Sequence, residues 1–186
     1  GGYGELGGST GRNITDNAPL RGGKGMLYEG GIRVPLIVRW PAVVNPDSVC
    51  SEAVISVDFF PTCLDAAGRL SEHTGPLDGV SLLPLLKSSG TDSLDREALY
   101  WHFPGYLQAD AKLGTWRTTP AGAIRDGNLK LIEFFEDGHV ELYDTAADIG
   151  ESNNLAAAMP DKARELHQRL IDWRKSVAAP MPTPKQ

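Results

Sequence analysis

The sequence has too few cysteines for a protein held together by disulfides or a cysteine-rich metal site. Its apolar runs are also too short for a membrane-spanning helix. Its two cysteines, Cys50 and Cys63, cannot build a disulfide framework or a cysteine-rich metal site. Cys63 lies in an apolar stretch with helical spacing, so we expect a buried thiol, and a bridge between the two cysteines stays open. No apolar run approaches the roughly 18 residues that a membrane span requires.

Positive charge is also scarce. The 186 residues include 18 lysines and arginines against 24 aspartates and glutamates, which gives a net charge of -6. This balance disfavours a nucleic-acid backbone as a partner. The chain also shows no initiator methionine and no signal peptide at its start, and we expect a fragment of a longer protein. Its length suffices for one good core or two small ones.

Glycine, in contrast, is abundant, and one glycine-rich segment organises the rest of the chain. Residues 21–35 read RGGKGMLYEGGIRVP, with Lys24 among the glycines and an apolar run directly after them. Glycine lets the backbone approach a ligand closely, and lysine is a compact charge suited to phosphate or sulfate. On residue types alone, a flexible surface loop with a solvated lysine explains the segment as well.

The pattern Gly-Lys-Gly-x-x-Tyr-Glu-Gly-Gly-x-Arg-x-Pro resembles the second signature of the type I, formylglycine-dependent sulfatases of the alkaline-phosphatase-like superfamily. Segments at 57–62, 77–82, 124–131 and 141–144 match the same family, in the family's order. The resemblance therefore covers most of the chain. It implies hydrolysis of sulfate esters, in sulfated sugars or aryl sulfates, and does not specify which.

The resemblance implies that Lys24 contacts the sulfate group. A fixed cation in a water-poor site stabilises the negative charge that builds on the bridging oxygen during hydrolysis. Arg21, Tyr28, Glu29 and Arg33 surround this lysine, and we interpret them as structural supports of the site. A Glu29 carboxylate near Lys24 or Arg33 would hold a cation in position through a charge-assisted hydrogen bond.

His102, within the run YWHFP at residues 100–104, is a second candidate for substrate binding. A histidine can hydrogen-bond a sugar hydroxyl or a leaving oxygen, and neighbouring aromatic rings can stack on a sugar. The family often has a pocket histidine in a similar tract, but a core histidine at a strand end fits the pattern equally. We expect His73, His139 and His167 at the surface.

Other parts of the family's site are missing from this sequence. The string Cys/Ser-x-Pro-x-Arg, which yields the formylglycine nucleophile, does not occur, and neither do the paired aspartates of the calcium site. Asp16 and Asn17 supply too few oxygen ligands for calcium and suit a turn. The acidic residues at 133–141 suit the solvated edge of a hairpin. We expect no metal ligand in this chain, calcium and nucleophile upstream of it, and no activity from this polypeptide alone.

The expected fold is an α/β, alkaline-phosphatase-like fragment: the end of a large, mostly parallel sheet, plus a small antiparallel sheet packed by a C-terminal helix. Residues 32–40 carry the strongest strand signal and would be the last strand of the large sheet. Residues 54–68 predict a helix capped by Asp58. Turn signals at 126–128 and 136–139 predict an antiparallel meander, and apolar spacing after residue 160 predicts the final helix.

We expect two domains. Residues 1–87 would belong to the catalytic domain, and residues 88–186 would form a small α+β subdomain with a disordered tail from about residue 179. The segment at 88–93 is rich in serine and glycine and suits a linker.

The sequence leaves three functions open: part of a sulfatase, a non-catalytic module that binds a sulfated glycan through Lys24 and His102, or a phosphoester or phosphonate hydrolase of the same superfamily. The expected partners are a sulfated carbohydrate or aryl sulfate and the missing N-terminal part of the same protein. The resemblance implies a periplasmic, secreted or lysosomal location, although nothing in the chain shows export.

Overall fold

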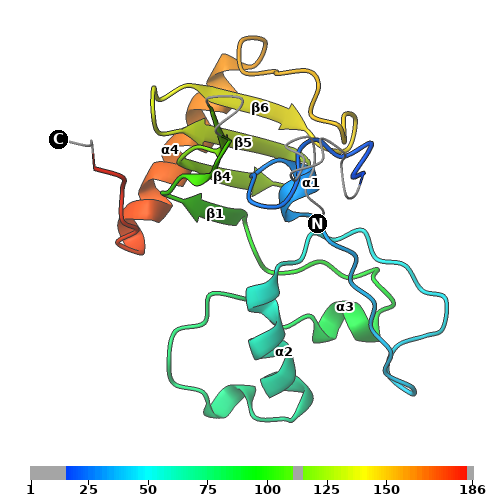
Figure 1. Cartoon of the computed structure of the whole chain (residues 1–186). Helices are drawn as coiled ribbons and strands as arrows, with labels where there is room; N and C mark the ends of the chain where they lie inside the picture. Colours follow the sequence, from blue (N-terminus) through cyan, green and yellow to red (C-terminus); the bar gives the residue numbers. More distant parts are fainter. Residues whose placement is uncertain (1–15, 111–114, 184–186) are drawn as a thin grey trace. The chain divides into compact units, whose positions relative to one another are not determined.

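A computed structural model describes residues 16–110 and 115–183 (Figure 1). The chain divides into two compact units, Gly1–Val34 with Ala98–Gln186, which we call the sheet unit, and Pro35–Glu97, which we call the helical unit. The boundary expected between residues 87 and 88 stays a prediction about the domains of the whole protein, because these units reflect contacts within this chain.

The sheet unit is built on four antiparallel strands in the order β1-β4-β5-β6. A tight turn with Gly127 at φ 56° joins β4 to β5, where the sequence predicted a hairpin. The antiparallel meander is thus confirmed. The strands are β1 (Leu99–Phe103), β4 (Ala121–Asp126), β5 (Leu129–Phe134) and β6 (Val140–Asp144), with β2 (Leu107–Asp110) and β3 (Thr115–Thr118) paired in a separate sheet.

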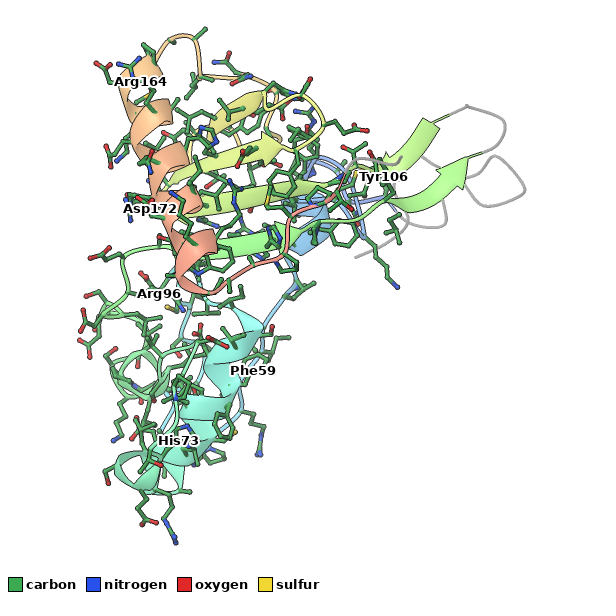
Figure 2. The ribbon with its side chains drawn as sticks, turned by 90° about the vertical axis from the view of Figure 1, so that its left-hand side faces the viewer. Phe59, His73, Arg96, Tyr106, Arg164 and Asp172 are labelled. Atoms are coloured by element: carbon green, nitrogen blue, oxygen red, sulfur yellow. The ribbon has the colours of Figure 1, made fainter. Side chains whose placement is uncertain are left out.

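The helix α4 (Pro160–Ser176) covers one face of the four-stranded sheet (Figure 1). Its buried apolar residues recur at spacings of three and four, as the sequence predicted, and charged side chains such as Arg164 and Asp172 lie on its outer side (Figure 2). The core between helix and sheet consists of Ile124, Leu131, Leu142, Ala163, Leu166 and Leu170.

The other face of the sheet is covered by a loop from the beginning of the chain. Leu27 and Tyr28 of this loop pack against Ala121, Ala123 and Ile132 of β4 and β5. A four-residue helix, α1 (Glu29–Ile32), follows the loop directly. The glycine-rich segment is thus placed on the sheet face opposite α4.

The helical unit contains α2 (Phe59–Ala66) and α3 (Leu83–Lys87), with short 3-10 turns at Ser56–Asp58 and Leu70–Glu72. Both cysteines are free and exposed, so the expectation of a buried thiol at Cys63 was wrong. The reason is that α2 is a short helix of which Pro61 alone is buried, so most of its apolar residues stay open to solvent.

The sequence had suggested that Asp58 caps α2, but its side chain makes no capping hydrogen bond to this helix. Its fully buried carboxylate accepts hydrogen bonds from the backbone N–H groups of Ile55 (2.9 Å) and Val80 (3.0 Å). Arg96 pairs with it at 2.7 Å. The carboxylate therefore joins three separate segments of the helical unit. Its buried charge is tolerated because a cation and two N–H donors meet it.

The strand expected at residues 32–40 is not formed. After α1 the segment has no regular structure, and Val34 and Ile37 are 63% and 90% exposed. A strand needs a neighbour to satisfy its N–H and C=O groups, and within the described part of the chain no strand pairs with this segment. Its apolar run indicated burial, but the layers that would bury it are not among the described residues.

No helix within residues 16–110 and 115–183 has both the length and the apolar content needed to cross a bilayer.

Candidate functional site

Lys24 lies in a closed loop formed by residues 21–30, which we call the Lys24 loop. The N–H group of Gly30 donates to the carbonyl of Arg21 (2.8 Å) and closes the loop at its base. Near the tip, the N–H group of Met26 donates to the carbonyl of Gly23 (3.0 Å), and this turn carries Lys24. The lysine is exposed, so the water-poor surroundings expected for it are not formed by the described residues.

The glycines of the signature have defined structural roles. Gly22 and Gly25 have φ values of 72° and 94°, which residues with a Cβ rarely adopt. At Gly31, just after the loop, a Cβ would stand 2.0 Å from the carbonyl oxygen of Met26. The backbone around Lys24 is therefore packed too tightly for side chains, which explains the glycine-rich composition.

Arg21 fixes the beginning of the loop to the sheet unit. Its Nη1 donates to the hydroxyl of Tyr143 (2.8 Å) and to the backbone carbonyl of Glu151 (2.9 Å). Its guanidinium carbon stands 4.0 Å from the ring centroid of Tyr28, which is a cation–π contact.

Two tyrosines join the same contact network. The hydroxyls of Tyr28 and Tyr143 both donate to Oε2 of Glu141, at 2.7 Å and 2.9 Å. Burial and these bonds to Glu141 raise the pKa of Tyr143 to about 12 and push the pKa of Tyr28 further upward. Both phenols are therefore neutral hydrogen-bond donors across the physiological pH range.

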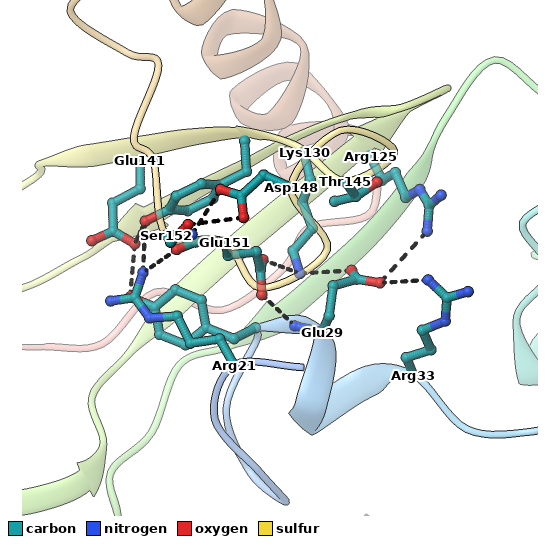
Figure 3. A network of polar contacts seen from close by, with 12 residues as sticks. Arg21, Glu29, Arg33, Arg125, Lys130, Glu141, Thr145, Asp148, Glu151 and Ser152 are labelled. Carbon is teal, nitrogen blue, oxygen red and sulfur yellow. Dashed lines mark hydrogen bonds and ion pairs between the residues drawn. The ribbon is translucent and has the colours of Figure 1, made fainter. Parts of the chain in front are cut away.

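The end of the loop is fixed by a buried ion cluster of Glu29, Lys130 and Glu151 (Figure 3), which we call the Lys130 cluster. All three residues are at most 1% exposed. Nζ of Lys130 lies 2.9 Å from Oε1 of Glu29 and 2.8 Å from Oε1 of Glu151. In addition, the backbone N–H of Glu29 donates to Oε2 of Glu151 at 2.6 Å.

The cluster holds two carboxylates around one ammonium group. Arg33 and Arg125 stand 3.5 Å and 3.9 Å from Oε2 of Glu29 and compensate part of its charge (Figure 3). Burial is the main reason why the pKa of Glu151 is raised; Lys130 opposes this shift, and the charge of Glu29 adds to it. The loop base is therefore fixed by strong, water-excluded electrostatic contacts.

The four residues predicted to support the site, Arg21, Tyr28, Glu29 and Arg33, all make contacts at or next to the loop base. The Glu29–Arg33 pair is present, and Glu29 also pairs with Lys130, which the sequence analysis missed. These contacts fit the supporting role, which stays a prediction.

Sequence reasoning missed both Lys130 and Glu151. A signal existed for Lys130: in β5 it points to the same face as Ile132, so a charge stands where alternation predicts an apolar residue. No comparable signal marked Glu151, which lies in an irregular segment after β6.

The structure does not bring His102 together with the Lys24 loop. Along β1, Trp101 packs on the face that carries Tyr28, and His102 lies on the opposite face, which α4 covers. The ring of His102 stands 5.4 Å from that of Phe135, and its Nε2 donates to the carbonyl of Pro180 (2.7 Å). Its substrate-binding role stays a prediction without support from this geometry.

The acidic residues at 133–141 were expected to form a solvated edge, but one of them is buried. Glu133 is 9% exposed, and it pairs with Arg174 and, at 3.0 Å, with His167, both on α4. Although burial raises it, the contacts from Arg174 and His167 bring the pKa of Glu133 below its ordinary value. This residue ties α4 to the sheet, and His167 is half-buried rather than a plain surface residue.

No group of three or more histidine, cysteine, aspartate or glutamate side chains suited to a metal ion occurs within the described residues. Asp16 accepts a hydrogen bond from the N–H of Ala18 (2.8 Å), which is a turn contact as expected. The side-chain amide of Asn17 donates to the carbonyl of Gly22 (3.1 Å) and so braces the Lys24 loop.

An apolar cavity of about 180 Å³ lies beside the loop. Met26, Leu27 and Tyr28 line one side of it, and residues of β4 and β5 line the other. The loop therefore packs on the sheet without filling all of the space beneath it.

Comparison with known proteins identifies the family. The family described as N-sulphoglucosamine sulphohydrolase, C-terminal, matches residues 23–176. A sulfatase of Formosa agariphila is 36% identical over 172 residues, which cover 86% of this chain and 30% of that protein. An N-acetylglucosamine-6-O-sulfatase of Bacteroides thetaiotaomicron is 36% identical over 156 residues, 82% of this chain and 26% of that protein.

Solved structures agree with this assignment. A protein solved in complex with its substrate D-glucosamine-2-N,6-O-disulfate is 33% identical to this chain, with a TM-score of 0.62. The match covers 81% of this chain and 30% of that protein's chain. The chain thus spans less than a third of the length of these relatives, and its small antiparallel sheet with the C-terminal helix corresponds to part of an alkaline-phosphatase-like fold. The chain belongs to the N-sulphoglucosamine sulphohydrolase C-terminal family, within the sulfatases.

Proposed function

We propose that this chain is the C-terminal part of a sulfatase that hydrolyses sulfate esters of sugars, and that Lys24 holds the sulfate group. The observation that carries the proposal is the Lys24 loop: a tight glycine turn presents the lysine, hydrogen bonds of Arg21 fix the beginning of the loop, and a buried ion cluster fixes its end. Two relatives are named as 6-O-sulfatases of N-acetylated amino sugars and match 82% and 81% of this chain, whereas steryl-sulfatases and an arylsulfatase match 49–64% of it. The longer matches favour a sulfated sugar, with an aryl or steryl sulfate as the alternative.

Hydrolysis of a sulfate ester is accelerated by a cation held in a fixed position. Hydrolysis breaks the bond between sulfur and the bridging oxygen, and negative charge builds on that oxygen as the sugar leaves. A preorganised cation or donor at such a charge contributes on the order of 10²–10³-fold in rate. A lysine on a fixed loop meets this need better than one on a mobile loop, because it needs no reorganisation when the charge forms.

The nucleophile and the calcium ion that the family resemblance implies find no counterpart within the described residues. These hold no cluster of metal-ligating side chains, and the sequence has no Cys/Ser-x-Pro-x-Arg string. We therefore assign to this chain the binding and orientation of the sulfate group, and no covalent step.

The test uses the full-length protein with glucosamine 6-O-sulfate as substrate, and 4-nitrophenyl sulfate and 4-nitrophenyl phosphate for comparison. Lys24→Ala should lower kcat/KM on the sulfated sugar by about a hundredfold or more. Lys175→Ala is the matched control, because that lysine is 73% exposed on α4, where its ammonium lies 3.7 Å from Asp172.

An unchanged rate in Lys24→Ala would remove the role of the lysine. If the full-length protein bound sulfated glycans through Lys24 but hydrolysed none of them, it would be a non-catalytic binding module. Faster turnover of the phosphate ester would instead point to a phosphoester hydrolase.

A further inference from the structure

Both ends of the Lys24 loop are tied to one residue, Glu151. Its backbone carbonyl accepts a hydrogen bond from Nη1 of Arg21, three residues before Lys24 (2.9 Å). Its carboxylate accepts one from the backbone N–H of Glu29, five residues after Lys24 (2.6 Å). A single residue far along the chain thus clamps the two sides of the loop that presents the lysine (Figure 3).

Glu151 is itself firmly fixed. Its second carboxylate oxygen lies 2.8 Å from the buried ammonium of Lys130, and its N–H donates to the carbonyl of Asp148 (3.1 Å). The Asp148 carboxylate accepts from the N–H groups of Ser152 (2.7 Å) and Asn153 (2.8 Å). Glu151 also has a φ of 51°, which a residue with a side chain rarely adopts. The surrounding contacts hold it in this conformation.

We propose that Glu151, with Lys130 behind it, is the positioning residue that sets where the amine of Lys24 stands. This inference rests on the proposed role of Lys24 in holding sulfate. Glu151 is fully buried and contacts the loop at its base rather than at its tip, so it acts through Lys24 and not on the substrate.

The physical reason is the sensitivity of catalysis to position. A shift of about 1 Å in a group that orients the substrate can cost up to about a hundredfold in rate. Freeing the Glu29 end of the loop would let the glycine-rich turn sample other conformations, because glycine restricts the backbone least. The lysine would keep its charge but lose its fixed position.

The test is a double-mutant cycle in the full-length protein with Lys24→Ala and Glu151→Ala. The second change removes both carboxylate contacts and leaves Lys130 and Glu29 as a balanced ion pair, so it disturbs the charge of the core least. Glu165→Ala on α4, where the carboxylate is half-exposed and pairs with Lys162 and Arg169, is the matched control.

We expect Glu151→Ala to lower kcat/KM by roughly ten- to a hundredfold. It should also weaken competitive inhibition by inorganic sulfate by a similar factor. In the Lys24→Ala background the same change should cost less than about twofold, because residues that act as a unit are not additive. A loss of the same size in both backgrounds would mean that Glu151 only stabilises the fold and would overturn the inference.

Two further outcomes are decisive. If Lys24→Ala leaves activity unchanged, the proposed role of Lys24 and this inference fall together; if it lowers activity while Glu151→Ala does not, only this inference falls. Should Glu151→Ala fail to fold, the cycle is run with Glu151→Gln, which keeps an acceptor for the Glu29 N–H group. Additive losses in that cycle would also overturn the inference.

Discussion

Lys130→Met tests whether the buried charges hold the sheet unit together. The side chain of Lys130 is fully buried, with its ammonium 2.9 Å from Glu29 and 2.8 Å from Glu151. Methionine fills much of the same space as the lysine stem, so the main loss is the positive charge. Two buried carboxylates then remain without the cation that both of them contact.

Removing one partner of a buried ion pair costs about 3–5 kcal/mol, because the remaining charge stays out of water. For a unit of this size, such a loss lowers the thermal midpoint by more than about 10 °C. The control is Lys175→Met, at a position 73% exposed, where we expect a change within about 0.5 kcal/mol.

The loss should depend on pH. Burial and the charge of Glu29 already raise the pKa of Glu151 above its ordinary 4.5, and Lys130 opposes that shift. A carboxyl group whose folded pKa lies above the unfolded value favours folding at low pH, and this contribution is lost as pH rises through the folded pKa. Without Lys130 the shift grows, so the variant should lose more stability at pH 8 than at pH 5.

The assay is urea unfolding followed by circular dichroism at both pH values, with wild type, Lys130→Met and the Lys175→Met control. A stability loss in Lys130→Met below about 1 kcal/mol, or one of equal size at pH 5 and pH 8, would refute the reasoning. Either result would mean that the two carboxylates are solvated well enough to do without the cation.

Two further predictions concern the loop backbone and the attachment of α4. Gly31→Ala should reduce turnover of the full-length protein and loosen the loop, because its Cβ would stand 2.0 Å from a carbonyl oxygen, whereas Gly105→Ala meets no atom within 4 Å and should be neutral in the same assays. Arg174→Met should cost about 3 kcal/mol at pH 7, measured by urea unfolding, because it leaves the carboxylate of Glu133 buried. The pKa of Glu133 is lowered in the folded protein, where burial is outweighed by Arg174 and His167, so its contribution is present above the unfolded value of 4.5 and is lost as the pH falls from there through the folded pKa. The deficit of the variant should therefore shrink at pH 3.5, and an undiminished deficit would contradict this account.

The elements predicted correctly from the sequence are those whose signals are local. The hairpin between β4 and β5 follows from the turn residues at 126–128, and α4 follows from apolar residues spaced by three and four. In both cases the residues that determine the structure are close in sequence, so the pattern specifies both the element and its buried face.

The failures share a different cause. The apolar run at 32–40 indicated burial, but a strand forms only beside a partner, and no local pattern shows where the partner is. Asp58 looked like a helix cap because two of its partners, Val80 and Arg96, are distant in the sequence. Cys63 looked buried because helical spacing does not show whether another layer covers the helix.

The candidate site was predicted only in part, because some of its residues carry local signals and others are defined by long-range contacts. The glycine signature located Lys24 and the residues beside it, and the family resemblance gave them their proposed roles. The alternation of β1 was not used, and it separates His102 from the Lys24 loop by placing it on the α4 face. Glu151 could not be found, because its contacts to the Lys24 loop reach residues more than a hundred positions earlier in the chain.

The long distance in sequence between the Lys24 loop and Glu151 has a consequence for biosynthesis. Arg21 and Glu151 are 130 positions apart, so a ribosome adding about 5–20 residues per second makes the lysine roughly ten seconds before it makes the clamp. Until then the glycine-rich turn lacks the contacts that Glu151 makes at both of its ends. A product that terminates before residue 151 would carry the complete signature motif without the residue that clamps both sides of its loop.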